Sequence, residues 1–226
     1  MAYKKGKSTY IMENSPSILS FASVASKTEG KGPLAEYFDI LNDDTSFGEK
    51  TWEKSERRMQ KYAVDKALEK AKISPGDVDI SLAGDLLNQC TASTFAMREY
   101  HIPYLGIYGA CSNMAETMVI SSLFIDSHIG KKILSATSSH FCTAERQYRF
   151  PLEYGGVRPP CSQWTVTGAG AVIIGENNET PPYVKAVSIG TIEDLGVKDA
   201  NNMGAAMAPV NVIIGQQSRC FVCAKK

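Results

Sequence analysis

The amino-acid sequence predicts an α/β protein with a mostly parallel sheet and helices on both of its faces. Strand-like and helix-like segments alternate along the chain, and this alternation is typical of parallel sheets. A turn of small residues around Cys111 also separates a short apolar run from a long helical one. In such folds, functional residues gather just beyond the carboxyl ends of the strands.

The first third of the chain predicts strands followed by a long helix. Residues 8–11 and 18–24 are apolar and β-leaning, and residues 14–16 predict a turn between them. Residues 51–71 predict an amphipathic helix with Thr51 as its N-cap. Apolar side chains recur at helical spacing on one face of this segment, at Trp52, Met59, Ala63, Ala67 and Ala71.

The rest of the chain continues the alternation. Strands are expected at residues 78–83, 103–108, 132–137, 165–174 and 183–192, and helices at 91–100 and 114–129. The helix at 114–129 is expected to be the most buried, with Ser121 and Ser122 in tight packing and Met118, Leu123 and Phe124 in the core. Residues 142–160 are rich in charge, aromatics, glycine and proline, which predicts a long loop.

Composition excludes several classes of protein. Lysine plus arginine and aspartate plus glutamate number 24 each, so no basic excess points to nucleic acid. No run of about 18 apolar residues predicts a membrane-spanning helix. The apolar run after the basic N-terminus is broken by Glu13, Asn14 and Pro16, so no signal peptide is expected. We expect a soluble chain.

The cysteines predict neither a disulfide framework nor a metal site. All six are scattered along the chain, unlike the dense pattern of small secreted scaffolds. Cys220 and Cys223 form a CxxC pair, but the sequence offers no second ligand pair nearby. No cofactor is predicted.

The turn at Cys111 is the strongest single indication of function. A strand, a small-residue turn with one cysteine and then a helix would present that cysteine at a helix N-terminus. Unpaired N–H groups and a partial positive charge at such an end favour a thiolate or a bound anion. The alternative is a small buried cysteine that packs beneath the helix.

Longer motifs carry a family resemblance. They are LAGDLLNQ at 82–89, GACS at 109–112, ATSSH at 136–140, AERQYRFPLEYGG at 144–156, TVTGAGA at 165–171 and MGAAMAP at 203–209. Together they resemble the stage V sporulation protein AD family of endospore-forming bacteria, within the thiolase superfamily. The resemblance implies a thiolase-like, three-layer half-fold with a mixed, mostly parallel sheet.

That resemblance covers residues 1–209, which we expect to form the N-terminal thiolase-like domain. Residues 210–226 no longer look like the family and are expected to be a divergent tail. A frameshift, a truncated gene model or a real short variant would each produce this pattern. Family members continue into a second half, which supplies histidine or asparagine groups for thiolase-type catalysis.

The family implies a protein of late sporulation that binds dipicolinic acid, alone or with calcium, and supports its uptake into the developing spore. Implied partners are other stage V sporulation proteins at the membrane, with the chain as a homodimer peripheral to the spore inner membrane. One alternative is a cysteine-dependent acyltransferase, in which Cys111 would be the nucleophile. Another is a non-functional fragment or a structural partner of a membrane assembly.

Within this setting, polar residues past the strand ends are candidate ligand contacts. A planar dianion suits backbone N–H groups, an imidazole and forked guanidiniums. The candidates are Asp85, Asn88, Cys111, Ser112, His140, Arg146 and Arg149. Asp85 and Asn88 also carry calcium-type oxygens. Purely structural roles remain open: a helix cap for Asp85, a satisfied core imidazole for His140 and loop ordering for the arginines.

Overall fold

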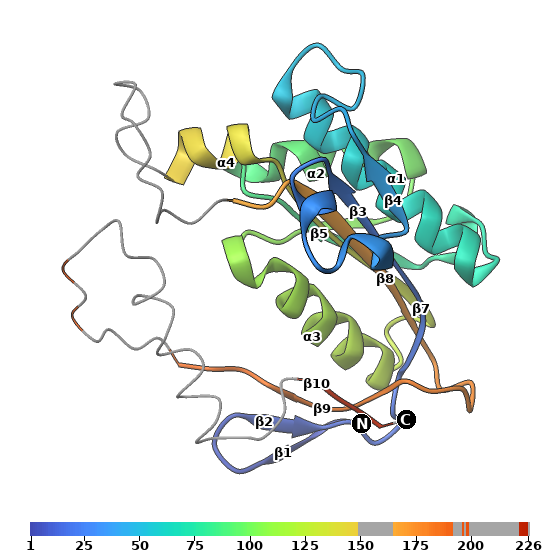
Figure 1. Ribbon diagram of the computed structural model, residues 1–226. Coiled ribbons are helices and arrows are strands. Elements are labelled where there is room, and N and C mark those ends of the chain that lie inside the picture. The colour runs from blue at the N-terminus through green and yellow to red at the C-terminus, as the bar shows by residue number, and fades with distance from the viewer. Residues whose placement is uncertain (149–164, 192–195, 197, 199–221, 226) are drawn as a thin grey trace.

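The strands of the chain join into one mixed sheet in the computed structural model, which describes residues 1–148, 165–191, 196, 198 and 222–225. The sheet order is β1-β2-β9-β3-β8-β7-β5-β6, with β4 beside β3 and β10 beside β9 (Figure 1). The strands are β1 Tyr3–Lys5, β2 Thr9–Ile11, β3 Ser17–Ser26, β4 Ile40–Asn42, β5 Ile80–Gly84, β6 Tyr104–Gly106, β7 Lys132–Ser139, β8 Gly168–Gly175, β9 Tyr183–Ser188 and β10 Val222–Lys225.

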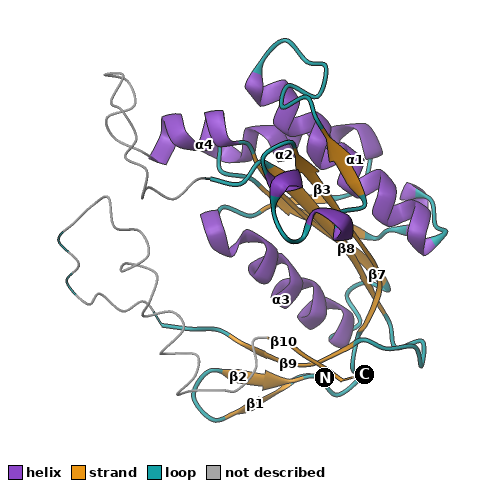
Figure 2. Ribbon diagram, viewed as in Figure 1, coloured by secondary structure: helices purple, strands orange, loops and turns teal. Residues whose placement is uncertain are grey.

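Helices cover both faces of this sheet, as predicted. The helices are α1 Trp52–Ala71, α2 Thr91–Met97, α3 Asn113–Asp126 and α4 Phe141–Tyr148. The first two pack on one face, α1 against β3, β7 and β8 and α2 against β5. The opposite face of the sheet carries α3, which contacts β5, β7 and β8 (Figure 2). This arrangement confirms the three-layer α/β fold.

The expectation of a mostly parallel sheet is wrong. Strand β5 pairs in parallel with β6 and β7, and β3 with β4. All other pairings between the described strands are antiparallel, and the longest of them arise because β8 lies between β3 and β7 and runs against both. β7 ends at Ser139 and β8 begins at Gly168, and these two residues are paired, so the chain re-enters the sheet at the end where it left. A return of this kind gives an antiparallel neighbour.

Some segments differ from their sequence predictions. Residues 142–160 were expected to be a loop, but this stretch begins inside helix α4. Strands β1, β4 and β10 were not predicted, because each contains only three or four residues. Such short strands carry too few residues to show an alternating pattern.

Helix α1 begins and ends as its sequence predicts. The Thr51 hydroxyl accepts a hydrogen bond from the N–H of Lys54 at 3.3 Å. Lys72 ends the helix in the left-handed conformation, with φ of 55°. Met59, Ala63 and Ala67 are fully buried, which confirms the centre of the predicted apolar face, whereas Trp52 at its start is exposed and Ala71 at its end is only partly buried.

Replacing Thr51 with alanine should therefore lower the free energy of unfolding by about 1 kcal/mol, the usual value of an N-cap hydroxyl. Urea denaturation monitored by circular dichroism measures the difference. Thr51→Ser keeps the hydroxyl and should retain most of the stability. A loss of the same size in both variants would contradict the capping role.

Helix α3 buries several polar side chains together with Val119 and Ile125, and leaves other apolar side chains half-buried. Ser121 and Ser122 are fully buried, as predicted, whereas Met118, Leu123 and Phe124 are only partly covered. The Ser121 hydroxyl lies 2.8 Å from the hydroxyl of Ser135 on β7. Small hydroxyl-bearing residues at these positions let the helix approach the sheet closely.

Candidate functional site

The turn that carries Cys111 stands directly at the start of α3. A short 3-10 turn, Ala110–Ser112, connects β6 to the helix, and Ala110 takes a positive φ of 49°. The side chain of Cys111 is exposed. The alternative of a buried packing cysteine is therefore wrong, and the sulfur is open to solvent or to a ligand.

A buried asparagine fixes this turn to the neighbouring strand. The Oδ1 atom of Asn113 accepts a hydrogen bond from the N–H of Gly109 at 2.7 Å. Its Nδ2 atom donates to the carbonyl oxygen of Asp85 at 3.1 Å. Because Asn113 is 1% exposed, one rigid side chain sets the position of the Cys111 turn relative to the end of β5.

The first turn of α3 also carries a carboxylate. The Ser112 hydroxyl lies 2.7 Å from the carbonyl oxygen of Gly109 and 3.3 Å from Oε2 of Glu116. A Cβ added to Gly109 would overlap this carboxylate and the Ser112 hydroxyl. The Glu116 carboxylate therefore lies directly against Gly109, and a larger residue there would displace the Glu116 and Ser112 side chains.

Asp85 lies where the sequence placed it, just past β5, but it faces inward. It is fully buried, and its carboxylate accepts hydrogen bonds from the N–H groups of Leu87 at 2.8 Å and Ser93 at 2.7 Å. Burial raises the pKa of this carboxyl, although both hydrogen bonds oppose that rise. The geometry matches the capping alternative, since Ser93 lies in the first turn of α2.

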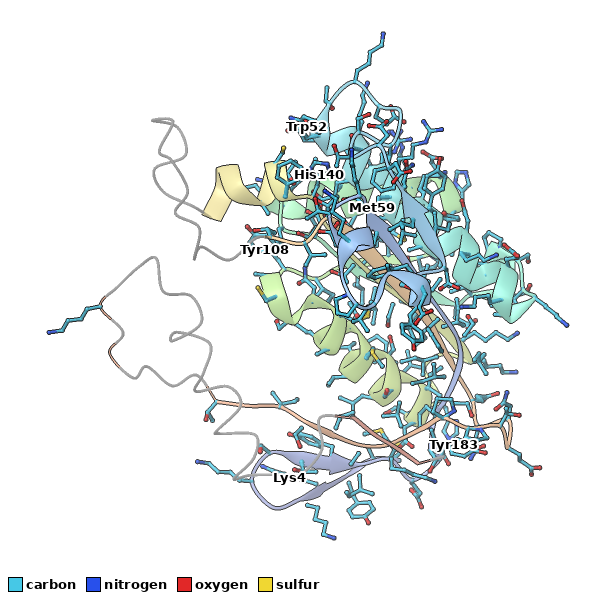
Figure 3. The ribbon with its side chains drawn as sticks, in the orientation of Figure 1. Lys4, Trp52, Met59, Tyr108, His140 and Tyr183 are labelled. Atoms are coloured by element: carbon cyan, nitrogen blue, oxygen red, sulfur yellow. The ribbon has the colours of Figure 1, made fainter. Side chains whose placement is uncertain are left out.

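His140 follows β7 as predicted and is also fully buried. Its Nε2 atom lies 2.9 Å from the carbonyl oxygen of Thr45, and its Nδ1 atom accepts from the N–H of Cys142 at 3.2 Å. These partners indicate the neutral tautomer with its proton on Nε2. Trp52 stacks on the ring at a centroid distance of 5.1 Å (Figure 3). The imidazole therefore holds the start of α4.

Asn88 lies on the exposed part of the same rim. The hydroxyl of Tyr108, which is 52% exposed, donates to its Oδ1 at 3.4 Å. Figure 3 places Tyr108 beside the N-terminal end of α3, next to the Cys111 turn. The outer surface of the rim thus combines an amide, a phenol, a thiol and the Ser112 hydroxyl.

The two arginine candidates cannot be placed in the same detail. The backbone of Arg146 lies in α4, which begins beside His140. Arg149 and the side chain of Arg146 lie outside the described residues. Contact of these residues with a ligand remains a prediction.

Sequence reasoning missed a buried polar group beneath the rim. Glu56 and Gln60 of α1 are fully buried. They lie one helical turn apart on the predicted apolar face, between Trp52 and Ala63. Polar residues at inward positions of an otherwise apolar stripe are unusual, and this signal was available in the sequence. Asn113 and Glu116 were missed because they follow the cysteine and look like ordinary helix residues.

The rim exposes polar groups, but His140 is not placed to activate a nucleophile. A nucleophilic cysteine needs a base within hydrogen-bonding reach, and both ring nitrogens of His140 are engaged with the backbone. Within the described part of the chain, no group of three or more His, Cys, Asp or Glu residues is arranged to hold a metal.

Comparison with known proteins identifies a family whose sequences match most of this chain. The sequence pattern of one family, described as Stage V sporulation protein AD, matches residues 6–218. A curated Stage V sporulation protein AD from Bacillus subtilis (strain 168) is 42% identical over 206 residues. That match covers 90% of this chain and 60% of the relative.

Solved structures share the fold at low sequence identity. 3-Oxoacyl-acyl-carrier-protein synthase III from Aquifex aeolicus VF5 is 18% identical with a TM-score of 0.50, over 72% of this chain and 54% of that one. A variant of OleA from Xanthomonas campestris is 13% identical with a TM-score of 0.60, over 92% of this chain and 72% of that one. These likenesses confirm the thiolase-like fold.

Proposed function

The chain belongs to the stage V sporulation protein AD family, and from this premise we propose that it binds dipicolinic acid at the Cys111 rim and supports its uptake into the developing spore. The single observation that carries the proposal is the exposed turn at the start of α3, with Cys111 and Ser112 open beside Asn88 and Tyr108. A helix N-terminus favours a carboxylate, and an exposed phenol offers a face for an aromatic ring.

The candidate residues then divide into two groups. Cys111, Ser112 and Asn88 are exposed and can touch the ligand, as can the arginines if their side chains reach the rim. Asp85 and His140 are buried and hold the loops that carry the exposed residues. Glu116 lies beside the same turn, so a dianion must bind on the side away from this carboxylate or together with a cation such as calcium.

Calorimetric titration of dipicolinate tests the proposal. Arg146→Ala should weaken binding roughly tenfold to hundredfold, as expected for a lost hydrogen bond to a charged group. Ser112→Ala removes a neutral hydroxyl and should cost about twofold to tenfold. Arg98→Ala is the matched control, because Arg98 packs over Phe95 at the far end of α2, and should bind as wild type does.

Ligand analogues sharpen this experiment. Isophthalate keeps both carboxylates but lacks the ring nitrogen, and picolinate keeps the nitrogen but has one carboxylate. Binding of picolinate as tight as that of dipicolinate would contradict recognition of a dianion. Absence of any binding at millimolar dipicolinate, with and without calcium, would contradict the proposed function itself.

A cysteine-dependent acyltransferase is the second candidate, favoured by the exposed Cys111 on a synthase-like fold. The engaged His140 argues against it. We expect no acyl adduct on Cys111 after incubation with acyl-CoA, as measured by intact-protein mass spectrometry, and slow labelling by iodoacetamide at neutral pH. Cys142→Ser, which alters a half-buried thiol, controls for other sites. An adduct that disappears in Cys111→Ser would establish the enzyme instead.

Partners at the membrane follow from the same proposal. No helix in the described part of the chain is both long and apolar enough to span a bilayer. We propose that the chain acts as a homodimer at the spore inner membrane, held there by other stage V sporulation proteins. Light scattering of the purified chain tests the dimer, and a monomer at all concentrations would contradict it.

A further inference from the structure

Glu56 is the buried acid of this fold that the proposed function leaves unused. It lies on α1 and is fully buried. Its Oε2 atom is 2.6 Å from the hydroxyl of Thr143 on α4, and its Oε1 atom is 3.2 Å from the hydroxyl of Ser138 on β7. One carboxyl group thus joins a helix of one layer, the central sheet and the first turn of α4.

Counting protons shows which form of the carboxyl this arrangement fits. The Thr143 hydroxyl also lies 2.9 Å from the carbonyl oxygen of His140, but it has only one proton to donate. If Glu56 is ionised, the Thr143 hydroxyl can donate either to the Glu56 carboxylate or to the His140 carbonyl oxygen. The other of these two short oxygen–oxygen contacts then has no proton between its atoms. If Glu56 is protonated, its O–H donates to Thr143, and Thr143 donates to His140.

The surroundings also favour the uncharged form. None of the ion pairs among the described residues includes Glu56. The titratable group that acts on it from a neighbouring element is the Asp85 carboxyl at the end of β5, and the backbone N–H of His140 donates a hydrogen bond to Glu56. Burial, followed by the charge of Asp85, raises the pKa of Glu56 to about 7, although its hydrogen bonds oppose this.

We propose that Glu56 is held as a carboxylic acid that donates its proton to Thr143, so that the Thr143 hydroxyl can donate in turn to the carbonyl oxygen of His140 and close the first turn of α4. Loss of the proton breaks only the O–H bond of the acid, and the proton passes to solvent. The charge stays on the carboxylate, and the Thr143 hydroxyl turns from His140 to Glu56. The first turn of α4 then loses one hydrogen bond. The proposal goes beyond the binding of dipicolinate and does not depend on it.

The direction of the pH effect follows from linkage. Burial raises the pKa of Glu56 to about 7 in the folded chain, and the ordinary value of 4.5 applies only when an opening exposes the carboxyl to water. Between these two pH values the folded form keeps a proton that the opened form has released. The stability that this proton gives the folded form is lost as pH rises through the folded pKa. Opening that exposes Glu56 should become easier as pH rises through this window, by at most about tenfold per pH unit, and should level off above it.

Two measurements on the full chain test this. The carboxyl-carbon resonance of Glu56, assigned by its absence in Glu56→Gln, should titrate near neutral pH in carbon-13 NMR. Amide exchange of Ala144, whose N–H donates to His140 at 3.0 Å, should speed up across the same window after correction for intrinsic exchange. Glu56→Gln mimics the protonated acid, since its amide can donate to Thr143, and should remove the slope.

Glu36→Gln is the matched control, because Glu36 is exposed on a separate loop, and it should keep the wild-type slope. A Glu56 resonance that titrates as an ordinary glutamate would overturn the proposal. So would an Ala144 exchange slope that is absent from wild type or that persists in Glu56→Gln.

Discussion

Replacing Gly84 with alanine should lower the free energy of unfolding by about 3 kcal/mol or more, near the upper end for an overpacked core. A Cβ at this position would overlap the carbonyl oxygen of Ile107 and lie 2.7 Å from Nδ2 of Asn113. The obstructing carbonyl belongs to the backbone, so no rotamer change relieves the contact. The end of β5 and the Cys111 turn would have to move apart.

Chemical denaturation of Gly84→Ala and Gly76→Ala gives a matched comparison. A Cβ at Gly76 would meet only the Ser74 hydroxyl at 3.7 Å, an ordinary contact, so this variant should stay within about 0.5 kcal/mol of wild type. Equal stability of the two variants would show that the backbone around Gly84 can accommodate a Cβ, and would contradict the predicted clash with the carbonyl oxygen of Ile107.

Asn113→Ala should destabilise the protein by about 2–4 kcal/mol, because it leaves the N–H of Gly109 and the buried carbonyl of Asp85 without their partner. It should also weaken dipicolinate binding, since the Cys111 turn loses its attachment to β5. Differential scanning calorimetry measures the first effect, and titration below the melting transition measures the second.

Asn113→Asp distinguishes between the two hydrogen bonds of Asn113, one accepted from Gly109 and one donated to Asp85. Aspartate can still accept from Gly109 but cannot donate to Asp85, so it should fall between wild type and Asn113→Ala. Asn177→Ala is the control, because Asn177 accepts only a local turn bond from the N–H of Glu179 among the described contacts. A loss in Asn177→Ala as large as that in Asn113→Ala would argue against a specific role for Asn113.

Local patterns in the sequence predicted the elements that depend on local forces. The cap at Thr51 and the apolar spacing of α1 both appear in the structure. The small residues around Cys111 form the expected turn before a helix. The rim was predicted as well, since Asp85, Cys111 and His140 all follow strand ends, and parallel β5, β6 and β7 bring these ends together.

Features set by long-range contacts could not be predicted in this way. The direction of β8 depends on where the chain re-enters the sheet, which no pattern within β8 records. Asp85 and His140 were placed correctly in sequence, but their burial follows from backbone groups of Leu87, Ser93 and Thr45. The contact between the buried Ser121 of α3 and Ser135 of β7 depends on a close approach that only tertiary packing defines.

The place of β8 in the sheet has a consequence for how the chain is made. β3 ends at Ser26 and β8 begins at Gly168, so about 140 residues must leave the ribosome before β3 meets its main partner. At roughly 5–20 residues per second this takes about 7–30 s. During that time the edge of β3 that β8 will occupy stays open, and the nascent chain is most vulnerable to wrong pairing there. We expect a ribosome-bound chain halted before Gly168 to be digested by protease, and one halted well beyond Gly175 to resist.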